Sequence, residues 1–362
     1  MAGLDKLLKK MVESGASDLH LSAGEPVRMR IDGELKRVAD KPLDPGRLRG
    51  LMREICSPTA WEFYRANNDL DFSYGIDGIS RFRCNYFMHV RGPGAVFRRI
   101  PEQIVPLEKL GLPESVMKIP ELKRGLVLMT GPTGSGKSTT LAAIIDRINR
   151  TRSLHIITIE DPIEFVHRTR QSLIVQREVG NHAASFSAAL FDALNEDPDV
   201  ILVGELRDTE TMQLAISAAE MGVLVLGTLH TNSAAKTIDR LVDSFPAAQR
   251  TQIRGMLSDS LRAVVAQQLL KRTDKPGRIA AIEVLLDGPG LPNIIREGNA
   301  AKLMSYIESG KGRGMQLLDE ALLHYVRKNV VSTEDAWLRS QDKLRFAKAL
   351  KAEGFQVDEG LL

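Results

Sequence analysis

Gly131-Pro-Thr-Gly-Ser-Gly-Lys-Ser138 matches the phosphate-binding loop pattern G-x-x-x-x-G-K-[ST] at every fixed position. The loop follows a short apolar run at 126–130 and precedes an amphipathic run at 139–146. A strand, a glycine loop and a helix in this order are the context that the pattern requires. The alternative is a glycine-rich turn that binds nothing, and both flanks argue against it. The sequence therefore predicts an α/β fold that binds a nucleotide.

The residue types of this loop predict how phosphate is held. Glycines let backbone N–H groups close around phosphate oxygens, and the N-terminus of the following helix adds partial positive charge. Lys137 is expected to neutralise the β- and γ-phosphates, and Ser138 to ligate Mg²⁺ through its hydroxyl. We therefore predict ATP and Mg²⁺ as cofactors. The predicted nucleotide-binding residues are Gly131, Pro132, Thr133, Gly134, Ser135, Gly136, Lys137, Ser138 and Thr139.

Composition narrows the class of protein. The 362 residues suggest two or three domains. The net charge of +3, from 49 basic and 46 acidic residues, is too balanced for the clustered positive charge that binds nucleic acid. Cys56 and Cys84 form no metal-binding spacing, which favours a reducing compartment. The sequence has no signal core and no run of about 18 apolar residues. We expect a soluble, cytoplasmic chain that reaches a membrane only through a partner.

Residues 1–100 predict a small α/β domain. An amphipathic helix is expected at 4–12, and strands at 27–31, 70–74, 79–88 and 94–100, with hairpin turns at Asp32-Gly33 and Asp77-Gly78. Alternation along 79–88 places Arg81, Arg83 and Asn85 on one face and Phe82, Cys84, Tyr86 and Met88 on the other. Prolines then punctuate the chain, and we place a linker at 101–114.

The pattern changes after this linker. Apolar strands alternate with helices, and the strands include 126–130, 155–159, 200–203 and 223–226. Such alternation predicts a mainly parallel sheet with helical crossovers. We expect a nucleotide-binding core at 115–290 and a helical C-terminal region at 291–362. In that region Met315, Leu318, Leu322 and Val326 form an apolar stripe at helical spacing, which indicates core packing.

Acidic residues follow two of the predicted strands. The first strand runs into Glu160-Asp-Pro-Ile-Glu164, and the second into Gly204-Glu205. A phosphate loop needs carboxylates that hold Mg²⁺ and that orient or deprotonate water. Because ligands of open α/β sheets bind at the carboxyl ends of strands, both segments are expected to face the loop. Each acid alone could be a helix cap, but their coincidence with the glycine loop favours a site.

A histidine follows another predicted strand, in Gly227-Thr-Leu-His-Thr-Asn-Ser233. His230 is placed to sense the γ-phosphate or to bridge to a neighbouring subunit. A lone histidine at a strand end is as often structural, so both readings stay open.

Taken together, these segments are similar to the type IV pilus retraction ATPases, the twitching-motility branch of the secretion ATPase superfamily. The resemblance covers nearly the whole chain. Beside the phosphate loop, it rests on Ala16-Ser-Asp-Leu-His-Leu21, the aspartate box Ile159-Glu-Asp-Pro-Ile-Glu-Phe165, the Walker B region Asp197-Pro-Asp-Val-Ile-Leu-Val-Gly-Glu-Leu-Arg-Asp208 and the histidine box Thr228-Leu-His-Thr-Asn-Ser-Ala234. It implies a PAS-like N-terminal domain, a RecA-like ATPase domain, ATP bound between them and a homohexameric ring. The implied partners are the pilus platform protein at the inner membrane and a paralogous ATPase.

The resemblance also implies roles for individual residues. Glu205 takes the Mg²⁺-site role of the Walker B acid, and Glu164 is the candidate general base. The N-terminal domain is expected to supply arginines to the nucleotide, and the candidates are Arg81, Arg83 and Arg98. A solvated strand face is the alternative for these arginines, because burying one without a partner would be costly.

Three positions depart from the family pattern. A second histidine is absent from the histidine box, where the chain reads Glu220-Met-Gly-Val223. Retraction ATPases carry a C-terminal segment close to Ala-Ile-Arg-Asn-Leu-Ile-Arg-Glu, which is matched by Gly290-Leu-Pro-Asn-Ile-Ile-Arg-Glu297 with Pro292 in place of arginine. Asn195 stands where an arginine is usual.

Three functions compete on these residues. The first is a motor that hydrolyses ATP to retract a pilus. The second is an extension or secretion ATPase, which commonly carries a four-cysteine zinc module and a longer N-terminal region, and which this chain fits poorly. The third is an accessory subunit that assists a main motor, which the altered C-terminal segment and the missing histidine leave open. The charge balance disfavours a DNA translocase.

Overall fold

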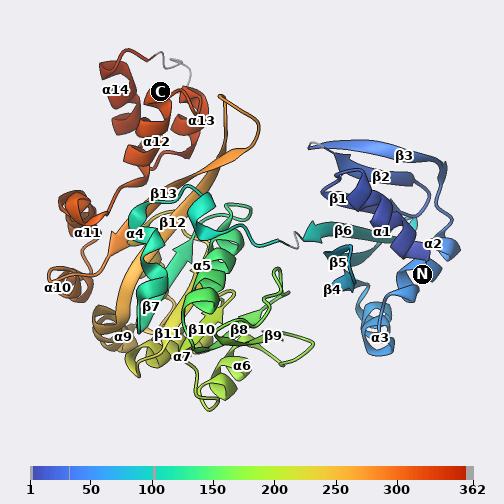
Figure 1. The fold of residues 1–362 in the computed structure, drawn as a ribbon, viewed down its shortest axis with the longest axis horizontal. Coiled ribbons are helices and arrows are strands. Elements are labelled where there is room, and N and C mark those ends of the chain that lie inside the picture. The colour runs from blue at the N-terminus through green and yellow to red at the C-terminus, as the bar shows by residue number, and fades with distance from the viewer. Residues whose placement is uncertain (1–2, 32, 101–102, 356–362) are drawn as a thin grey trace. The chain divides into compact units, whose positions relative to one another are not determined.

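The computed structural model describes residues 3–31, 33–100 and 103–355. The chain divides into two compact units (Figure 1). Unit 1 comprises 1–103 together with 162–166, and unit 2 comprises 104–161 and 167–362. Each unit has its own β-sheet and its own hydrophobic core. The α/β class predicted from the sequence is confirmed.

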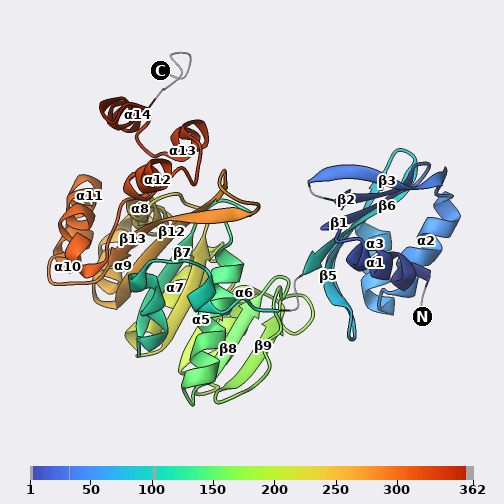
Figure 2. The same ribbon diagram turned by 45° about the horizontal axis from the view of Figure 1, so that its top comes forward.

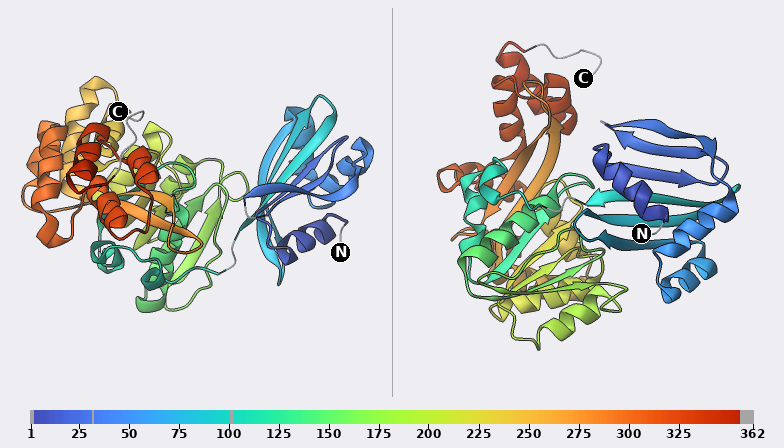
Figure 3. Two further views of the ribbon diagram at one scale, coloured as in Figure 1. Left: turned by 90° about the horizontal axis from the view of Figure 1, so that it is seen from above. Right: turned by 45° about the vertical axis from the view of Figure 1, so that its right-hand side comes forward.

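Unit 1 is built on a six-stranded antiparallel sheet in the order β3-β2-β1-β6-β5-β4. Its strands are β1 (Asp18–Ser22), β2 (Pro26–Ile31), β3 (Glu34–Pro42), β4 (Asp69–Ile76), β5 (Ser80–His89) and β6 (Gly92–Ile100). The helices α1 (Gly3–Glu13), α2 (Pro45–Glu54) and α3 (Pro58–Asn67) pack on one face of this sheet (Figure 3). Both α2 and α3 begin with a capping side chain, Asp44 or Ser57, followed by proline in the first turn.

Alternation along β5 separates a buried face from a polar face. The fully buried side chains under the helices are Phe82, Cys84 and Tyr86. The arginines between them lie on the opposite face, as predicted. Met88 follows the same alternation, but its side chain is 39% exposed. Met88 lines an open cavity of about 590 Å³ together with Trp61 and Tyr64 of α3.

The helix and the second hairpin predicted for unit 1 are confirmed, with small shifts of their ends. At the second hairpin Gly78 has a φ of 71°, which favours glycine. The first predicted turn includes Asp32, which lies outside the described residues. The strand β3 was not predicted because its residues are polar and mostly exposed.

Unit 2 contains a seven-stranded sheet in the order β13-β12-β7-β11-β10-β8-β9. All neighbouring strands are parallel except β12 and β13, so the predicted parallel sheet is confirmed. The strands are β7 (Gly125–Thr130), β8 (His155–Glu160), β9 (Leu173–Glu178), β10 (Val200–Val203), β11 (Leu224–Leu229), β12 (Leu261–Lys271) and β13 (Arg278–Leu286). The sequence reasoning did not find β9, β12 or β13. The alanines, leucines and glutamines of β12 favour a helix in isolation, and burial in the sheet overrides that preference.

Helices cover both faces of this sheet, which explains the continuous apolar runs of its central strands. On one face α5 (Lys137–Thr151) packs with η1 (Leu107–Lys109), α4 (Glu114–Met117) and η2 (Ile119–Glu121). The other face carries α6 (Phe186–Ala193), α7 (Thr209–Glu220), α8 (Ala234–Asp243), α9 (Ala247–Ser260), α10 (Leu291–Glu297) and α11 (Ala300–Ser309). Figure 2 shows α5 in front of the strands and α7 behind them.

The segment predicted as a linker packs largely on unit 2. Leu107 of η1 and Val116 of α4 are fully buried in the same hydrophobic cluster as α5. The division between the units falls after Gln103, and residues 101 and 102 lie outside the described part of the chain. The connection is therefore shorter than the predicted range of 101–114.

The C-terminal region is helical, as predicted. After η3 (Lys311–Arg313), the helices α12 (Leu318–Arg327), α13 (Thr333–Arg339) and α14 (Lys343–Ala352) pack over the far ends of β12 and β13 (Figure 1). The predicted core packing is confirmed for Leu318, Leu322 and Val326 of α12, which are buried in one cluster. Met315 is also buried, but it precedes the helix and packs in a different cluster. Among the described residues, no helix has the length and apolar character needed to cross a membrane.

Candidate active site

The phosphate loop joins β7 to α5, and its backbone requires glycine. Gly131, Gly134 and Gly136 have φ angles of 142°, 78° and 89°, which other residues rarely adopt. A Cβ atom on Gly131 would lie 2.2 Å from the carbonyl oxygen of Gln267. Nothing lies within 4 Å of a Cβ on Gly134, and Ser138 is exposed. The loop is therefore tightly packed on one side and open on the other, as a phosphate cradle must be.

Gln267 of β12 supports the loop from its packed side. Its Nε2 donates to the Ser135 carbonyl oxygen at 2.7 Å, and its Oε1 accepts from the Thr140 hydroxyl at 2.9 Å. This buried amide ties the loop to the first turn of α5. The sequence reasoning missed Gln267. The available signal was a pair of glutamines, Gln267 and Gln268, inside an otherwise apolar run.

The loop and the start of α5 fit phosphate groups. The α5 N-terminus has no side-chain cap, so its first N–H groups can face an anion. Lys137 Nζ donates to the carbonyl oxygens of Gly131 and Pro132 at 2.7 and 3.2 Å, which places its charge over the loop. The hydroxyl of Ser135 is buried without a hydrogen-bond partner within the described ranges. A nucleotide phosphate would accept from the N–H groups of this helix end and from Lys137, whereas the Ser135 hydroxyl is enclosed on the packed side of the loop.

Two of the acids predicted at the strand ends, Asp161 and Glu205, meet the predicted histidine beside this loop. Glu205 follows β10, and its Oε1 lies 3.2 Å from His230 Nε2, which follows the neighbouring strand β11. Arg207 joins two acids, since its Nε lies 2.8 Å from Glu205 Oε2 and its Nη1 3.3 Å from Asp161 Oδ2. The four side chains Asp161, Glu205, Arg207 and His230 form what we call the strand-end cluster. Arg207 was not singled out from the sequence, although it lies two residues past Glu205.

Close backbone packing fixes the position of Glu205. Gly204 donates its N–H to the Ile159 carbonyl oxygen at 2.7 Å, and a Cβ on Gly204 would lie only 3.1 Å from that oxygen. The hydroxyl of Thr228 donates to the carbonyl oxygen of Gly204. The turn after β10 is thus held between β8 and β11, and this close packing favours glycine directly before the acid.

The predicted acidic segment 160–164 does not act as one group. Glu160 accepts hydrogen bonds from the Thr158 hydroxyl at 2.7 Å and from Gln176 Nε2 at 3.2 Å, within the sheet. Asp161 joins the strand-end cluster, whereas Glu164 belongs to the segment 162–166 that is part of unit 1. The sequence pattern predicted the acids but not this division.

The three candidate arginines lie on the open face of the unit 1 sheet and have polar partners there. The contacts are Arg81 Nη2 to Ser73 Oγ at 2.9 Å, Arg83 Nε to Asp71 Oδ2 at 3.2 Å and Arg98 Nε to Asp18 Oδ1 at 2.8 Å. Arg83 and Arg98 are direct cross-strand neighbours. Although burial alone would raise it, hydrogen bonds from Ser17 and Arg98 hold the pKa of Asp18 below its usual value. The sequence reasoning placed the arginines correctly but missed their acidic partners.

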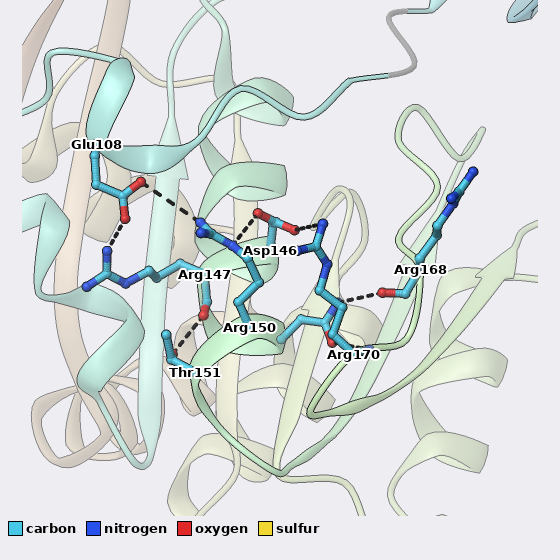
Figure 4. Close-up of polar contacts among 8 residues, drawn as sticks. Glu108, Asp146, Arg147, Arg150, Thr151, Arg168 and Arg170 are labelled. Carbon is cyan, nitrogen blue, oxygen red and sulfur yellow. Dashed lines mark hydrogen bonds and ion pairs between the residues drawn. The ribbon is translucent and has the colours of Figure 1, made fainter.

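A network of ion pairs and hydrogen bonds anchors the far half of α5 (Figure 4). Asp146 lies 2.9 Å from Arg150 Nε and 4.0 Å from Arg170 Nη2, and Glu108 of η1 pairs with Arg147. The Asn149 side chain holds the backbone at both ends of 168–170, at 2.7 and 3.0 Å. Each exposed ion pair contributes little by itself. Together they attach the helix of the phosphate loop to the segments that precede β7 and β9.

A parallel sheet with a phosphate loop after a central strand, and with acids after two others, defines a phosphate-loop nucleoside triphosphatase. Residues 2–354 match the model of the family described as "Type II/IV secretion system protein". The chain therefore belongs to the type II/IV secretion system protein family, and within it to the branch of pilus retraction and twitching motility ATPases.

Individual relatives support this branch. The chain is 49% identical over 333 residues to the type IV pilus retraction ATPase PilT of Pseudomonas aeruginosa, covering 92% of this chain and 96% of the relative. It is 45% identical over 339 residues to a twitching motility protein of Neisseria gonorrhoeae, covering 94% and 90%. The crystal structure of the pilus retraction motor PilT with bound ADP matches with a TM-score of 0.89 at 42% identity, covering 96% of this chain and 99% of that one.

Proposed function

We propose that this chain hydrolyses Mg-ATP and uses the reaction to drive retraction of a type IV pilus. The observation that carries the proposal is the meeting of Glu205 and His230 at the ends of adjacent strands, beside the strand that leads into the phosphate loop. The names of the relatives, which concern pilus retraction and twitching, supply the cellular process. The PilT structure holds ADP, which supports an adenine nucleotide as the ligand.

In this proposal, different residues of unit 2 bind the phosphates and the Mg²⁺ ion. Residues 131–139 would bind the phosphates, with Lys137 neutralising the transferred group. Ser138 and Glu205 offer the oxygen ligands that Mg²⁺ prefers, and this ion usually takes only one or two protein ligands beside phosphate oxygens. In the described ranges, no group of three or more His, Cys, Asp or Glu side chains could hold a metal ion by itself. A bound Mg²⁺ would supply charge neutralisation to the phosphates.

The proposed base and the proposed arginines belong to unit 1. Glu164 would accept the proton of the attacking water. Arg81, Arg83 and Arg98 would contact the phosphates, and Arg83 and Arg98 would exchange their carboxylate partners for that contact. Each exchange breaks an ion pair of an arginine whose side chain is 42% or 68% exposed, and such exposed pairs contribute little.

We further propose a PAS-like fold for unit 1, a RecA-like fold for unit 2 and a homohexameric assembly. The single helical layer on the antiparallel sheet of unit 1 and the phosphate loop after the central strand of unit 2 support these assignments. The proposed partners are the platform protein of the pilus machine and a paralogous ATPase. The proposed location is the cytoplasmic side of the inner membrane, reached through that machine.

Deletion of the gene tests the direction of the motor. A retraction ATPase predicts cells that assemble pili but cannot withdraw them, so they become hyperpiliated and lose twitching. Bald cells would instead indicate the extension ATPase. ATP hydrolysis by the purified protein, compared with Lys137→Ala, separates a motor from a passive nucleotide-binding module.

A second candidate function is an accessory ATPase that assists a main retraction motor. Two observations favour it: Pro292 replaces an arginine in the first turn of α10, and the second histidine of the histidine box is absent. Proline in a first helical turn leaves α10 intact, so the change removes a charge and not the helix. An accessory role predicts that twitching persists after single deletion and is reduced only when the main motor is impaired.

A further inference from the structure

A buried carboxylate of β13 joins two helices and a loop. Glu283 is only 2% exposed, and its two oxygens accept three hydrogen bonds. Oε1 accepts from the Ala234 N–H at 2.7 Å. Oε2 accepts from the Leu318 N–H at 3.3 Å and from Gln341 Nε2 at 2.9 Å. This residue lies outside both the phosphate loop and the strand-end cluster.

The position of the donors explains how a buried acid is tolerated. Ala234 is the first residue of α8 and Leu318 the first of α12, so the partial positive ends of both helices face Glu283. The α12 N-terminus has no local side-chain cap, and Glu283 takes that place. Burial raises the pKa of Glu283, while the N–H groups of Ala234 and Leu318 oppose that rise.

The same contacts fix one end of the histidine loop, which we define as 228–233. The helix α8 begins directly after this loop, so the bond from Ala234 to Glu283 anchors its end. Gln341 Nε2 also donates to the carbonyl oxygen of Asn232 at 3.0 Å. One amide therefore connects the loop to Glu283, while His230 within the loop contacts Glu205.

The contacts continue into the C-terminal helices. Asp319, in the first turn of α12, accepts from the N–H groups of Gln341 and Asp342 at 2.7 and 3.2 Å. Asp342 in turn caps α14 through the Arg345 N–H. The helices α12, α13 and α14 (Figure 1) are thus connected to the histidine loop through Gln341 and Glu283.

We propose that Glu283 is a positioning residue that holds the histidine loop so that His230 stays at Glu205, and that links this loop to the C-terminal helices. The inference rests on the catalytic roles proposed above for Glu205 and His230. Glu283 reaches the loop indirectly, because it binds Ala234, which directly follows the loop, and Gln341, which binds the Asn232 carbonyl oxygen.

Hydrogen exchange tests whether Glu283 holds the loop, independently of ATPase activity. Glu283→Gln keeps the size of the side chain but replaces one accepting oxygen with an NH₂ group. Because both oxygens accept from backbone N–H groups, the NH₂ group would face one of these donors. We expect faster amide exchange in 228–236 of the variant, with little change in 131–140. Gln341→Ala, at an exposed position, provides a second variant that leaves the buried carboxylate in place and should accelerate exchange less. Unchanged exchange in both variants overturns the inference.

A kinetic cycle tests whether holding the loop matters for chemistry. We expect Glu283→Gln to lower kcat roughly tenfold, as misplacement of a catalytic group does, with the KM for Mg-ATP nearly unchanged. If the effect acts through His230, the double variant Glu283→Gln with His230→Ala should be no slower than His230→Ala alone. If the fold-losses in kcat of the two single variants multiply in the double variant, the proposed route through the loop is overturned. Wild-type kcat in His230→Ala would instead refute the histidine role in the proposed function, while the exchange result still decides whether Glu283 holds the loop.

Leu350→Ala provides a matched stability control. Leu350 is fully buried in α14 among the same C-terminal helices, and no hydrogen bond of its side chain is involved. Its truncation should lower the melting temperature through a cavity and leave kcat unchanged below the unfolding transition. An equal fall of kcat in Leu350→Ala would show that Glu283→Gln acts through general destabilisation, which contradicts the proposal.

Discussion

The phosphate loop and the histidine loop are both held by side chains of the β12–β13 hairpin, but in opposite ways. Gln267 of this hairpin contacts the phosphate loop through a carbonyl oxygen, that of Ser135. Glu283 contacts the histidine loop region through an N–H group, that of Ala234. The first arrangement leaves backbone N–H groups for an anion. The second arrangement occupies a backbone N–H group, and the His230 side chain stays in contact with Glu205.

This difference explains why one supporting side chain is an amide and the other a carboxylate. A neutral amide can donate to carbonyl oxygens without placing charge near phosphates, whereas a carboxylate there would repel them. At the histidine loop the acceptor faces two helix N-termini, where negative charge is favoured. Each loop is thus supported at the groups that its function does not need. The following substitutions test that conclusion, in order of decreasing effect on ATP hydrolysis.

Lys137→Ala should nearly abolish turnover, by at least about 1,000-fold, because it removes the charge that contacts the transferred phosphoryl group. Steady-state ATPase assays of the purified variant measure this loss. His230→Ala should lose less, because it removes a partner of Glu205 and not a phosphate contact. Wild-type turnover in Lys137→Ala would contradict the reading of 131–138 as the catalytic loop.

Glu164→Gln should still bind Mg-ATP but hydrolyse it about 100-fold more slowly or worse, since glutamine keeps the shape and loses the proton acceptor. Glu205→Gln should in addition raise the Mg²⁺ concentration needed for half-maximal activity. Nucleotide binding by fluorescence and Mg²⁺ titrations of the rate separate the two. Normal hydrolysis in Glu164→Gln together with an inactive Glu205→Gln would assign the base to Glu205.

Arg83→Ala and Arg98→Ala should bind ATP adequately and hydrolyse it about tenfold more slowly, the low end for losing a group that stabilises developing charge. Specific activity should also rise with protein concentration, since the proposed ring completes the site. Asp71→Asn frees Arg83 without removing its charge and should retain most activity. Full activity in both arginine variants, or in a verified monomer, would return these residues to a solvated strand face.

Gln267→Met should raise the KM for ATP about fivefold with a smaller change in kcat, because the loop loses buried hydrogen bonds worth about 1 kcal/mol. Gln268→Met is the matched control. It lies on the opposite face of β12, where its Nε2 lies 3.4 Å from the Arg339 carbonyl oxygen. Titration of the rate with ATP gives both constants. Equal KM values for the two variants would show that Gln267 does not support the loop.

Arg296→Ala should change the ATPase rate by no more than about twofold, because exposed ion pairs contribute little. Its Nη2 lies 2.9 Å from Asp259 Oδ1 between α10 and α9, outside both loops. Retraction in cells should nevertheless be impaired if the segment 290–297 couples hydrolysis to the pilus. Normal twitching with this substitution would remove the coupling role.

Much of the fold could be predicted from the sequence because it depends on short patterns. The phosphate loop, the strands before each acid and the arginine face of β5 follow from glycine placement and from alternation. Asp71 and Asp18, the partners of the arginines, were missed because they become neighbours only when strands pair across the sheet.

The supports of the two loops were missed for the same kind of reason. Gln267 lies far from Ser135 along the chain, and Glu283 far from Ala234. Nothing in the local sequence distinguishes Glu283 from an exposed acid of a strand. Its role depends on two helix N-termini that the fold brings together.

The hairpin that carries both supports also limits where the sequence can change length. Ala266 pairs with Glu283 and Gln267 pairs with Ile282, so the two supporting side chains lie on opposite faces of the sheet. One residue inserted into β13 would reverse the faces of everything beyond it and turn Glu283 toward the α5 side. Residues added to the exposed turn at 272–277 would change neither face. Natural length variation in this hairpin should therefore be confined to its tip.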